Sequence, residues 1–257
     1  MMKVLTFYFL LSAFCSFLFI SSAFSQEPDP QITVQFHDAG VAYKAKDYKK
    51  AIELYNGIIK TGLAGGPVYY NLGNSYLKSN QWGEAILNYE RARRLMPRDA
   101  DLASNHRYAL FQIKNDQGGA QKEPWSNRLL NPYADFFTLD EMTVILFVCF
   151  FLTGMVYFLG LFLKWPASNY TVSIIILCLV LFLNGFIFVY KAGRQKNLAV
   201  ILKTAPAKFE PLKDATTYFE LSPGGRVKIL KQESEWMKVR RLDGKEGWVN
   251  QEALQKI

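Results

Sequence analysis

The most informative absence in this sequence is that of cysteine from its polar parts. The three cysteines, Cys15, Cys149 and Cys178, all lie in long apolar blocks, and the polar stretches outside these blocks contain none. Disulfides and cysteine-ligated zinc sites are therefore excluded from the polar stretches. Histidine is also scarce, because the chain has only His37 and His106.

Motifs for catalysis are lacking as well. Neither a glycine-rich phosphate loop nor a His-Glu-x-x-His motif accompanies the two histidines, each of which falls in a predicted helix. The carboxylates Glu53, Glu84 and Glu90 have ordinary spacings for a helix surface, so we expect them to be solvated. We expect a protein that is not an enzyme, with no catalytic residue, metal ligand or cofactor.

Positive charge gathers near the C-terminus. Residues 26–127 carry 13 Lys and Arg against 11 Asp and Glu, whereas residues 191–257 carry 14 against 8. Such an excess either contacts anionic lipid or an acidic polymer, or forms an ordinary solvated surface, and the second interpretation is favoured. No segment resembles a nucleic-acid-binding module, so nucleic acid is not an expected partner.

Three long apolar blocks hold much of the 50% hydrophobic content. The first, residues 1–25, has Lys3 near its start, continues without charge to Ile20, and has the small residues Ala23 and Ser25 near its end. This order is typical of a cleavable signal peptide, and an uncleaved N-terminal anchor is the alternative.

The second and third blocks predict a transmembrane hairpin. Residues 142–163 and 172–190 contain no charge, and each approaches the roughly 20 residues that cross a bilayer as a helix. The turn between them, residues 164–171, is too short for a domain. If the signal peptide exports the polar segment after it, the polar parts on both sides of the hairpin lie outside the cytoplasm.

The charges around the hairpin agree with this topology only in part. Lys164 in the turn fits a cytoplasmic position, but Lys191, Arg194 and Lys196 follow the second span on the predicted outer side. We give the signal peptide more weight, because the excess of positive charge on the cytoplasmic side is a statistical tendency.

Residues 26–116 contain an internal repeat. Two patterns recur 33 and 34 residues later in the chain: Ala39-Gly40-x-x-Tyr43 as Leu72-Gly73-x-x-Tyr76, and Ala51-x-x-x-Tyr55 as Ala85-x-x-x-Tyr89. These small and aromatic positions, with Pro97 closing the second unit, are those of the tetratricopeptide repeat. The sequence therefore predicts paired antiparallel helices near 33–45, 48–61, 67–79 and 82–95.

The small residues of this repeat explain its packing. Gly40, Gly73, Ala51 and Ala85 are expected to let neighbouring helices approach closely, with tyrosines filling the remaining space. Asp99 is the expected N-cap of a further helix, about 100–114, that covers the open end of the stack. Residues 117–141 are a predicted linker, and its aromatic part, 125–137, is a candidate approach to the membrane interface.

Residues 191–257 change from helical to strand periodicity. Val227-x-Ile229 and Met237-x-Val239 alternate as strands do, and Asp243-Gly244 is typical of a hairpin turn. The segments Trp236-Met237-Lys238-Val239-Arg240 and Gly247-Trp248-Val249, in this order around the turn, resemble the bacterial SH3 family. That resemblance implies a five-stranded bent barrel with a core of Val227, Ile229, Val239, Val249 and Leu254.

The SH3-like segment also has a candidate groove of four aromatic residues, Tyr218, Phe219, Trp236 and Trp248. Two interpretations of the tryptophans remain open: they line a ligand groove, or they plug the small barrel. The paired tyrosines of proline-binding SH3 domains are absent, so recognition of proline-rich peptides is not expected.

The fold class predicted from the whole chain is a multidomain membrane protein, with all-α repeat hairpins, a two-helix transmembrane hairpin and a small all-β SH3-like barrel. This order of parts resembles the BatE-type proteins of the Bacteroides aerotolerance operon. The resemblance implies location in the bacterial inner membrane with both soluble domains in the periplasm. It also implies membrane partners with von Willebrand A domains, in a system linked to oxidative stress or envelope integrity.

We expect the repeats to bind a protein segment through the concave face of their first helices. Seven residues are predicted there: His37, Lys44, Tyr70, Asn74, Lys78, Asn105 and Tyr108. Their amides, cations and hydroxyls suit an extended peptide, particularly an acidic or C-terminal one. Asn74 and Asn105 could equally satisfy neighbouring backbone groups.

The function predicted from the sequence is that of a membrane-anchored periplasmic adaptor. The alternative is a module that binds the cell wall or an anionic surface through the SH3-like domain.

Overall fold

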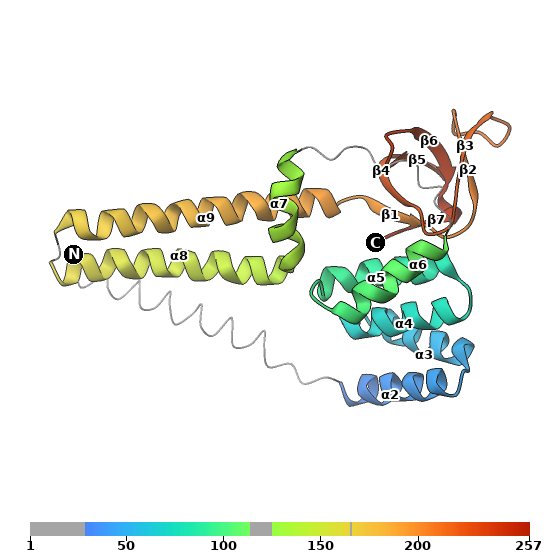
Figure 1. Ribbon diagram of the computed structural model, residues 1–257, viewed down its shortest axis with the longest axis horizontal. Helices are drawn as coiled ribbons and strands as arrows, with labels where there is room; N and C mark the ends of the chain where they lie inside the picture. The colour runs from blue at the N-terminus through green and yellow to red at the C-terminus, as the bar shows by residue number, and fades with distance from the viewer. Residues whose placement is uncertain (1–28, 114–124, 165) are drawn as a thin grey trace. The chain divides into compact units, whose positions relative to one another are not determined.

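The computed structural model describes residues 29–113, 125–164 and 166–257 (Figure 1). The predicted signal peptide, 1–25, and residues 117–124 of the predicted linker lie outside the described residues. The described chain divides into two compact units. One includes the helical segment Leu139–Ala192, and the other joins Pro30–Thr138 with Gly193–Ile257.

The repeat domain consists of five helices. Their bounds are α2 Pro30–Lys44, α3 Tyr48–Lys60, α4 Gly66–Lys78, α5 Trp82–Leu95 and α6 Ala100–Gln112. In Figure 1 they follow one another as antiparallel neighbours, which is the arrangement of tetratricopeptide repeats. The predicted repeat architecture is therefore confirmed, with α2 beginning three residues earlier than expected.

Local signals in the sequence set the ends of these helices. The side chain of Asp99 accepts a hydrogen bond from the backbone N–H of Leu102, which confirms the predicted N-cap of α6. Asp47 caps α3 in the same way, by accepting from the N–H of Lys50. Pro67 stands in the first turn of α4, where its missing N–H costs nothing.

The four small residues of the repeat do not all pack equally tightly. Ala51 and Ala85 are fully buried, as predicted. A Cβ added to Gly73 would lie 2.7 Å from the ring of Tyr89 and 3.3 Å from the carbonyl oxygen of Ala85. A Cβ at Gly40 would meet only the hydroxyl of Tyr55, at 3.9 Å. The close helix approach predicted for both glycines is thus present at Gly73 and absent at Gly40.

Helix α7 (Trp125–Phe136) lies within residues 117–141, which were predicted to be a linker, and belongs to the same compact unit as the repeats. Arg194 lies at the end of helix α9 (Ala167–Gln195) and contacts the side chains of Asn131 and Asp135 on α7. The guanidinium of Arg98 lies 5.2 Å from the ring centroid of Phe136. These charged and aromatic contacts attach α7 to the rest of its unit.

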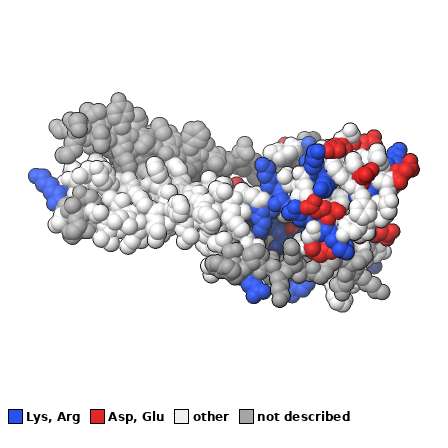
Figure 2. Space-filling model, turned by 90° about the horizontal axis from the view of Figure 1, so that it is seen from above, with Lys and Arg blue, Asp and Glu red and all other residues white. Residues whose placement is uncertain are grey.

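The other unit is built on two long helices, α8 (Leu139–Phe162) and α9 (Ala167–Gln195). Both are long and apolar enough to cross a membrane, and the face of this pair in Figure 2 is almost entirely without charged side chains. The helices run antiparallel, because a short turn joins them and Leu146 of α8 lies near Gly185 of α9, at a similar distance along the chain from that turn. The turn predicted at 164–171 is shorter in the structure, because α9 begins directly after Pro166.

The SH3-like module is a seven-stranded antiparallel sheet with the order β3-β2-β6-β5-β4-β1-β7. Its strands are β1 Leu198–Ile201, β2 Ala205–Lys208, β3 Thr217–Leu221, β4 Arg226–Glu233, β5 Trp236–Arg241, β6 Glu246–Asn250 and β7 Leu254–Lys256, with a 3-10 turn at Gln251–Ala253. The expected five strands were too few, because the short β1 and β7 pair with each other at one edge of the sheet. Residues 191–195, assigned to this module from the sequence, continue α9.

The core of the module is the predicted one. Val227, Ile229, Val239, Val249 and Leu254 are all buried in one apolar cluster. The turn between β5 and β6 is the predicted Asp243-Gly244 pair, and Gly244 has a φ of 90°, which glycine adopts without strain.

Gly73→Ala is expected to destabilise the protein, because the added methyl overpacks the contact with Tyr89. Overpacking costs about 1–3 kcal/mol in the free energy of unfolding, against a gain of about 1 kcal/mol from helix propensity. The matched variant Gly40→Ala has room for its methyl, so propensity should raise stability by up to about 1 kcal/mol. Chemical denaturation of the full-length protein measures the free energy of unfolding of both variants. Equal stability of the two variants would contradict the packing described for Gly73.

Candidate partner-binding sites

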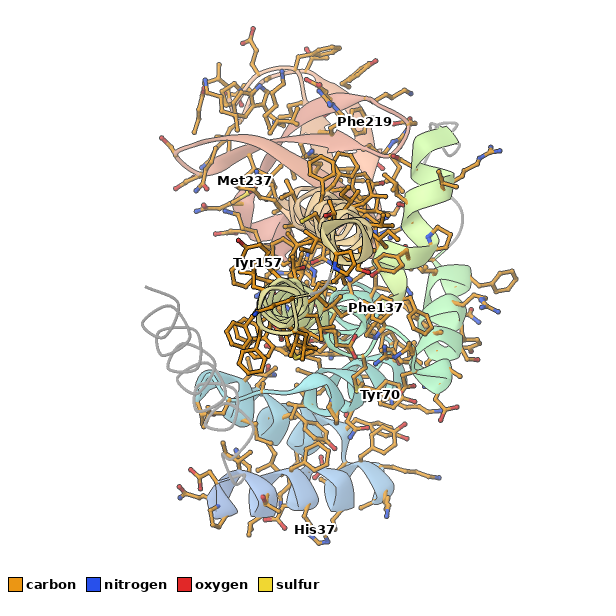
Figure 3. The ribbon with its side chains drawn as sticks, turned by 90° about the vertical axis from the view of Figure 1, so that its left-hand side faces the viewer. His37, Tyr70, Phe137, Tyr157, Phe219 and Met237 are labelled. Carbon is orange, nitrogen blue, oxygen red and sulfur yellow. The ribbon has the colours of Figure 1, made fainter. Side chains whose placement is uncertain are left out.

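The seven residues predicted to bind a partner lie on α2, α4 and α6, the first helix of each successive pair. His37 and Lys44 are on α2, Tyr70, Asn74 and Lys78 on α4, and Asn105 and Tyr108 on α6. Figure 3 labels His37 and Tyr70 and shows them on different helices of the repeat domain. The structure links three of the seven directly.

The linked residues form a hydrogen-bond network between α4, α5 and α6. The Nδ2 of Asn105 donates to the hydroxyl of Tyr70 and to the Oδ1 of Asn74, each at 3.0 Å. The hydroxyl of Tyr89 on α5 donates to the same Oδ1 at 2.7 Å. The asparagines therefore bond to side chains of neighbouring helices, and the Oδ1 of Asn74 is fully occupied by two donors.

Tyr89 is the member of this network that the site prediction missed, since its repeat position indicated packing alone. Tyr89 is fully buried, and the centroid of its ring lies 6.2 Å from that of Tyr70. Burial raises the pKa of Tyr89 far above its ordinary value, with a further contribution from Tyr70. The hydroxyl thus stays protonated and remains a donor to Asn74.

Helical spacing brings two exposed residues onto the same face as the network. Lys78 follows Asn74 by one turn of α4, and Tyr108 follows Asn105 by one turn of α6. Lys78 is exposed, and Tyr108 is 53% exposed. We call the five residues Tyr70, Asn74, Lys78, Asn105 and Tyr108 the α4–α6 face. It offers hydroxyl, amide and ammonium groups held on packed helices.

The two predicted residues on α2 take no part in this network. The side chain of His37 is 76% exposed, and its Nδ1 lies 3.6 Å from a carboxylate oxygen of Asp38. Lys44 is exposed in the last turn of α2.

Glu90 corrects an expectation, because this carboxylate was predicted to be solvated and is buried. Its Oε1 lies 3.2 Å from the Nε2 of His106, 3.3 Å from the Nη1 of Arg226 and 3.6 Å from the Nη1 of Arg93. Burial alone would raise the pKa of Glu90, but the contact with His106 and the positive charge of Arg226 outweigh it and hold the pKa at about 2. Glu90 is therefore ionised at neutral pH and paired on three sides.

A second candidate site is an aromatic patch on the SH3-like module, formed by Phe209, Tyr218 and Phe219. The ring centroids of Phe209 and Tyr218 are 4.7 Å apart, and those of Tyr218 and Phe219 are 5.2 Å apart. Phe209 is 58% exposed and Tyr218 46% exposed. Tyr218 and Phe219 were predicted from the sequence, whereas Phe209 was missed, although it stands directly after a strand beside them.

Two cations lie over this patch. The Nζ of Lys245 is 5.9 Å from the ring centroid of Tyr218, and the guanidinium of Arg241 is 5.0 Å from that of Phe219. Arg241 also donates from Nε to Asp243 at 3.0 Å, and this bond holds the pKa of Asp243 at about 2. The patch is thus apolar at its centre, with the positive charge of Lys245 beside it and that of Arg241 neutralised by Asp243.

The two tryptophans of the candidate groove differ in their surroundings. Trp248 is 9% exposed and belongs to the interior of the module. Trp236 is half-buried, and the Nζ of Lys208 lies 5.7 Å from its ring centroid.

Within the three described ranges, no group of three or more His, Cys, Asp or Glu side chains could hold a metal ion.

Comparisons with known proteins identify the two modules. The tetratricopeptide repeat family matches residues 66–99, which span α4, α5 and the following turn. The family described as the bacterial SH3 domain matches residues 209–255. A comparison with curated proteins gave no match. The chain therefore combines a tetratricopeptide repeat with a bacterial SH3 domain, and these two modules contain the α4–α6 face and the aromatic patch.

Proposed function

We propose that this protein is a membrane-anchored, non-enzymatic adaptor of the bacterial envelope that captures a protein segment on its α4–α6 face. The observation that carries the proposal is the network in which Asn105 joins Tyr70 and Asn74 across two helices. Side chains that are hydrogen-bonded to one another in this way are preorganised, so less conformational entropy is lost when a ligand binds. Tetratricopeptide repeats are themselves protein-interaction modules, and α-helical repeat surfaces serve this role generally.

The chemistry of the face favours an acidic or C-terminal segment. Lys78 supplies an ammonium group, and Asn74, whose Oδ1 is taken by Tyr89 and Asn105, presents its amide hydrogens. Tyr108 adds an exposed ring for apolar contact. The proposal assigns no catalysis to the histidines, since His37 is exposed beside Asp38 and His106 is buried against Glu90.

Lys78→Glu combined with Tyr108→Ser is expected to reduce partner capture by about tenfold or more, because it reverses a charge and removes an aromatic contact. Both side chains are exposed, so the melting temperature of the protein should stay within about 2 °C of wild type. A photo-crosslinking residue in place of Ser104, which is exposed on α6 one turn before Tyr108, measures the capture in intact cells by mass spectrometry.

The matched control for this variant is Lys60→Glu, which makes the same charge reversal at the last residue of the neighbouring helix α3. Capture that stays at the wild-type level in the double variant, or that falls equally in the control, would rule out the α4–α6 face.

We place the protein in the inner membrane, with the repeats and the SH3-like module both in the periplasm. The resemblance to the BatE-type proteins supports this location, and it suggests von Willebrand A domain proteins as partners. The ion pair between buried Glu90 and half-buried Arg226 gives independent support. One residue precedes α8 and α9 in the chain and the other follows them, so their contact supports a topology in which both helices cross the membrane and both residues lie on one side of it.

Protease added to spheroplasts should therefore degrade both soluble parts, while the turn at Lys164 stays protected. Antibodies against residues 30–113 and 198–257 detect the two parts separately. Protection of the SH3-like module alone would show that one helix crosses the membrane, and the cations after α9 would then be cytoplasmic.

The aromatic patch favours a second candidate function, binding of the cell wall. Its exposed rings, with Lys245 nearby, can stack on an extended polymer and attract acidic groups, and bacterial SH3 domains suggest this ligand.

Phe209→Ser with Tyr218→Ser should release the detergent-solubilised full chain from sedimented wall material, because the stacked rings are lost. The matched control is Leu242→Ser, which replaces another exposed apolar residue of the same module. Equal sedimentation of the wild type and both variants would exclude the patch as a wall-binding site.

A further inference from the structure

The repeat domain and the SH3-like module meet at an exceptionally close contact. A Cβ added to Gly83 in α5 would lie 2.6 Å from the carbonyl oxygen of Leu202 and 2.9 Å from that of Ile201. These are backbone atoms of the segment that includes β1, so they cannot move aside as a flexible side chain can. Glycine at position 83 thus allows the main chain of one module to touch that of the other.

A second glycine makes the reciprocal contact from the SH3-like module. Gly224, in the turn before β4, has a φ of 80°, and an added Cβ would overlap the Cδ1 of Ile86 and lie 2.6 Å from the Cδ1 of Ile113. Each module therefore provides one glycine at the contact, against backbone atoms at Gly83 and against the ends of isoleucine side chains at Gly224, so the two surfaces fit closely.

Strand β1 belongs to the apolar cores of both modules. Ala199 and Ile201 are buried in the core of the SH3-like module, whereas Val200, on the opposite face of the strand, is buried with Ile86 and Leu102 of the repeats. All three strand residues have no exposed surface. A strand that is apolar on both faces must be covered on both, and the repeat domain provides the second cover.

Polar groups complete the contact. Arg94 donates to the carbonyl oxygens of Ile257 at 2.9 Å and Gln195 at 3.1 Å, and Arg91 donates to that of Lys256 at 3.1 Å. Arg226 of the SH3-like module forms an ion pair with Glu90 of α5. Helix α5 thus holds both β7 and the chain entering β1, and its buried carboxylate is paired with a cation of the opposite module.

We infer that the β1–β7 face of the SH3-like module is an interaction surface whose partner is helix α5 of the same chain. Docked there, the module covers the repeat stack, so the two modules fold and unfold as one body. A short repeat array needs its apolar surface covered, and α6 covers it only in part. The α4–α6 face and the aromatic patch lie outside this contact, so both remain available to external ligands on a rigid frame.

Hydrogen exchange of the full-length protein in lipid nanodiscs tests the inference. Gly83→Ala should speed exchange by about tenfold or more in α5 and also in β1 and β7, because opening the contact exposes both sides together. The matched variant Gly193→Ala, whose added methyl meets nothing within 4 Å, should exchange as the wild type does.

If Gly83→Ala prevents folding, a pair of milder variants tests whether the two modules open together. Arg226→Met removes a cation that pairs with Glu90 across the contact, whereas Arg240→Met removes one that pairs with Glu246 inside the sheet. Arg226→Met should speed exchange in α5 and α6 by about tenfold, and Arg240→Met should leave these helices unchanged.

Exchange in α5 and α6 that is unchanged by Arg226→Met would overturn the inference, as would Gly83→Ala affecting α5 alone. The experiment includes no external partner, so its result does not depend on whether the adaptor proposal is correct.

Discussion

The architecture of the unit that joins the repeats and the SH3-like module depends on the burial of one short strand from both sides. Ala199 and Ile201 complete the core of the sheet, and Val200 completes the core of the repeats. Because β1 follows α9 directly in the chain, this double burial joins segments that the long helices separate in sequence. The repeats and the sheet are positioned by the same few apolar contacts.

Much of this structure could be predicted from local sequence. The 33- and 34-residue spacings located α2 to α5, Asp99 marked the start of α6, and Asp243-Gly244 fixed a hairpin. Features that depend on distant partners could not be predicted. Glu90 has the spacing of a helix-surface carboxylate, and its burial results from Arg226, which is 136 residues further along the chain. Gly83 likewise gave no sign that another backbone would lie against it.

In the candidate sites, too, features set by local sequence could be predicted, and features that depend on distant partners could not. Helical periodicity predicts that Tyr70 and Asn74 share a face of α4, because they are one turn apart, and the structure brings Asn105 of α6 to both. It could not reveal that Tyr89 completes their network, since a tyrosine at this repeat position also packs against Gly73. One ring therefore serves both the packing of the stack and the arrangement of its polar surface.

The discontinuous unit also sets an order of assembly during synthesis. The repeats leave the ribosome first, and the strand that covers them is made only after both long helices. Until then the apolar side chains of Ile86 and Leu102 lack one of their native neighbours, Val200, and a partly covered core is prone to misassociation. Under the topology proposed above, a chain that inserts one helix instead of two would leave β1 on the wrong side of the bilayer. Completion of the repeat core would then report that both helices have been inserted.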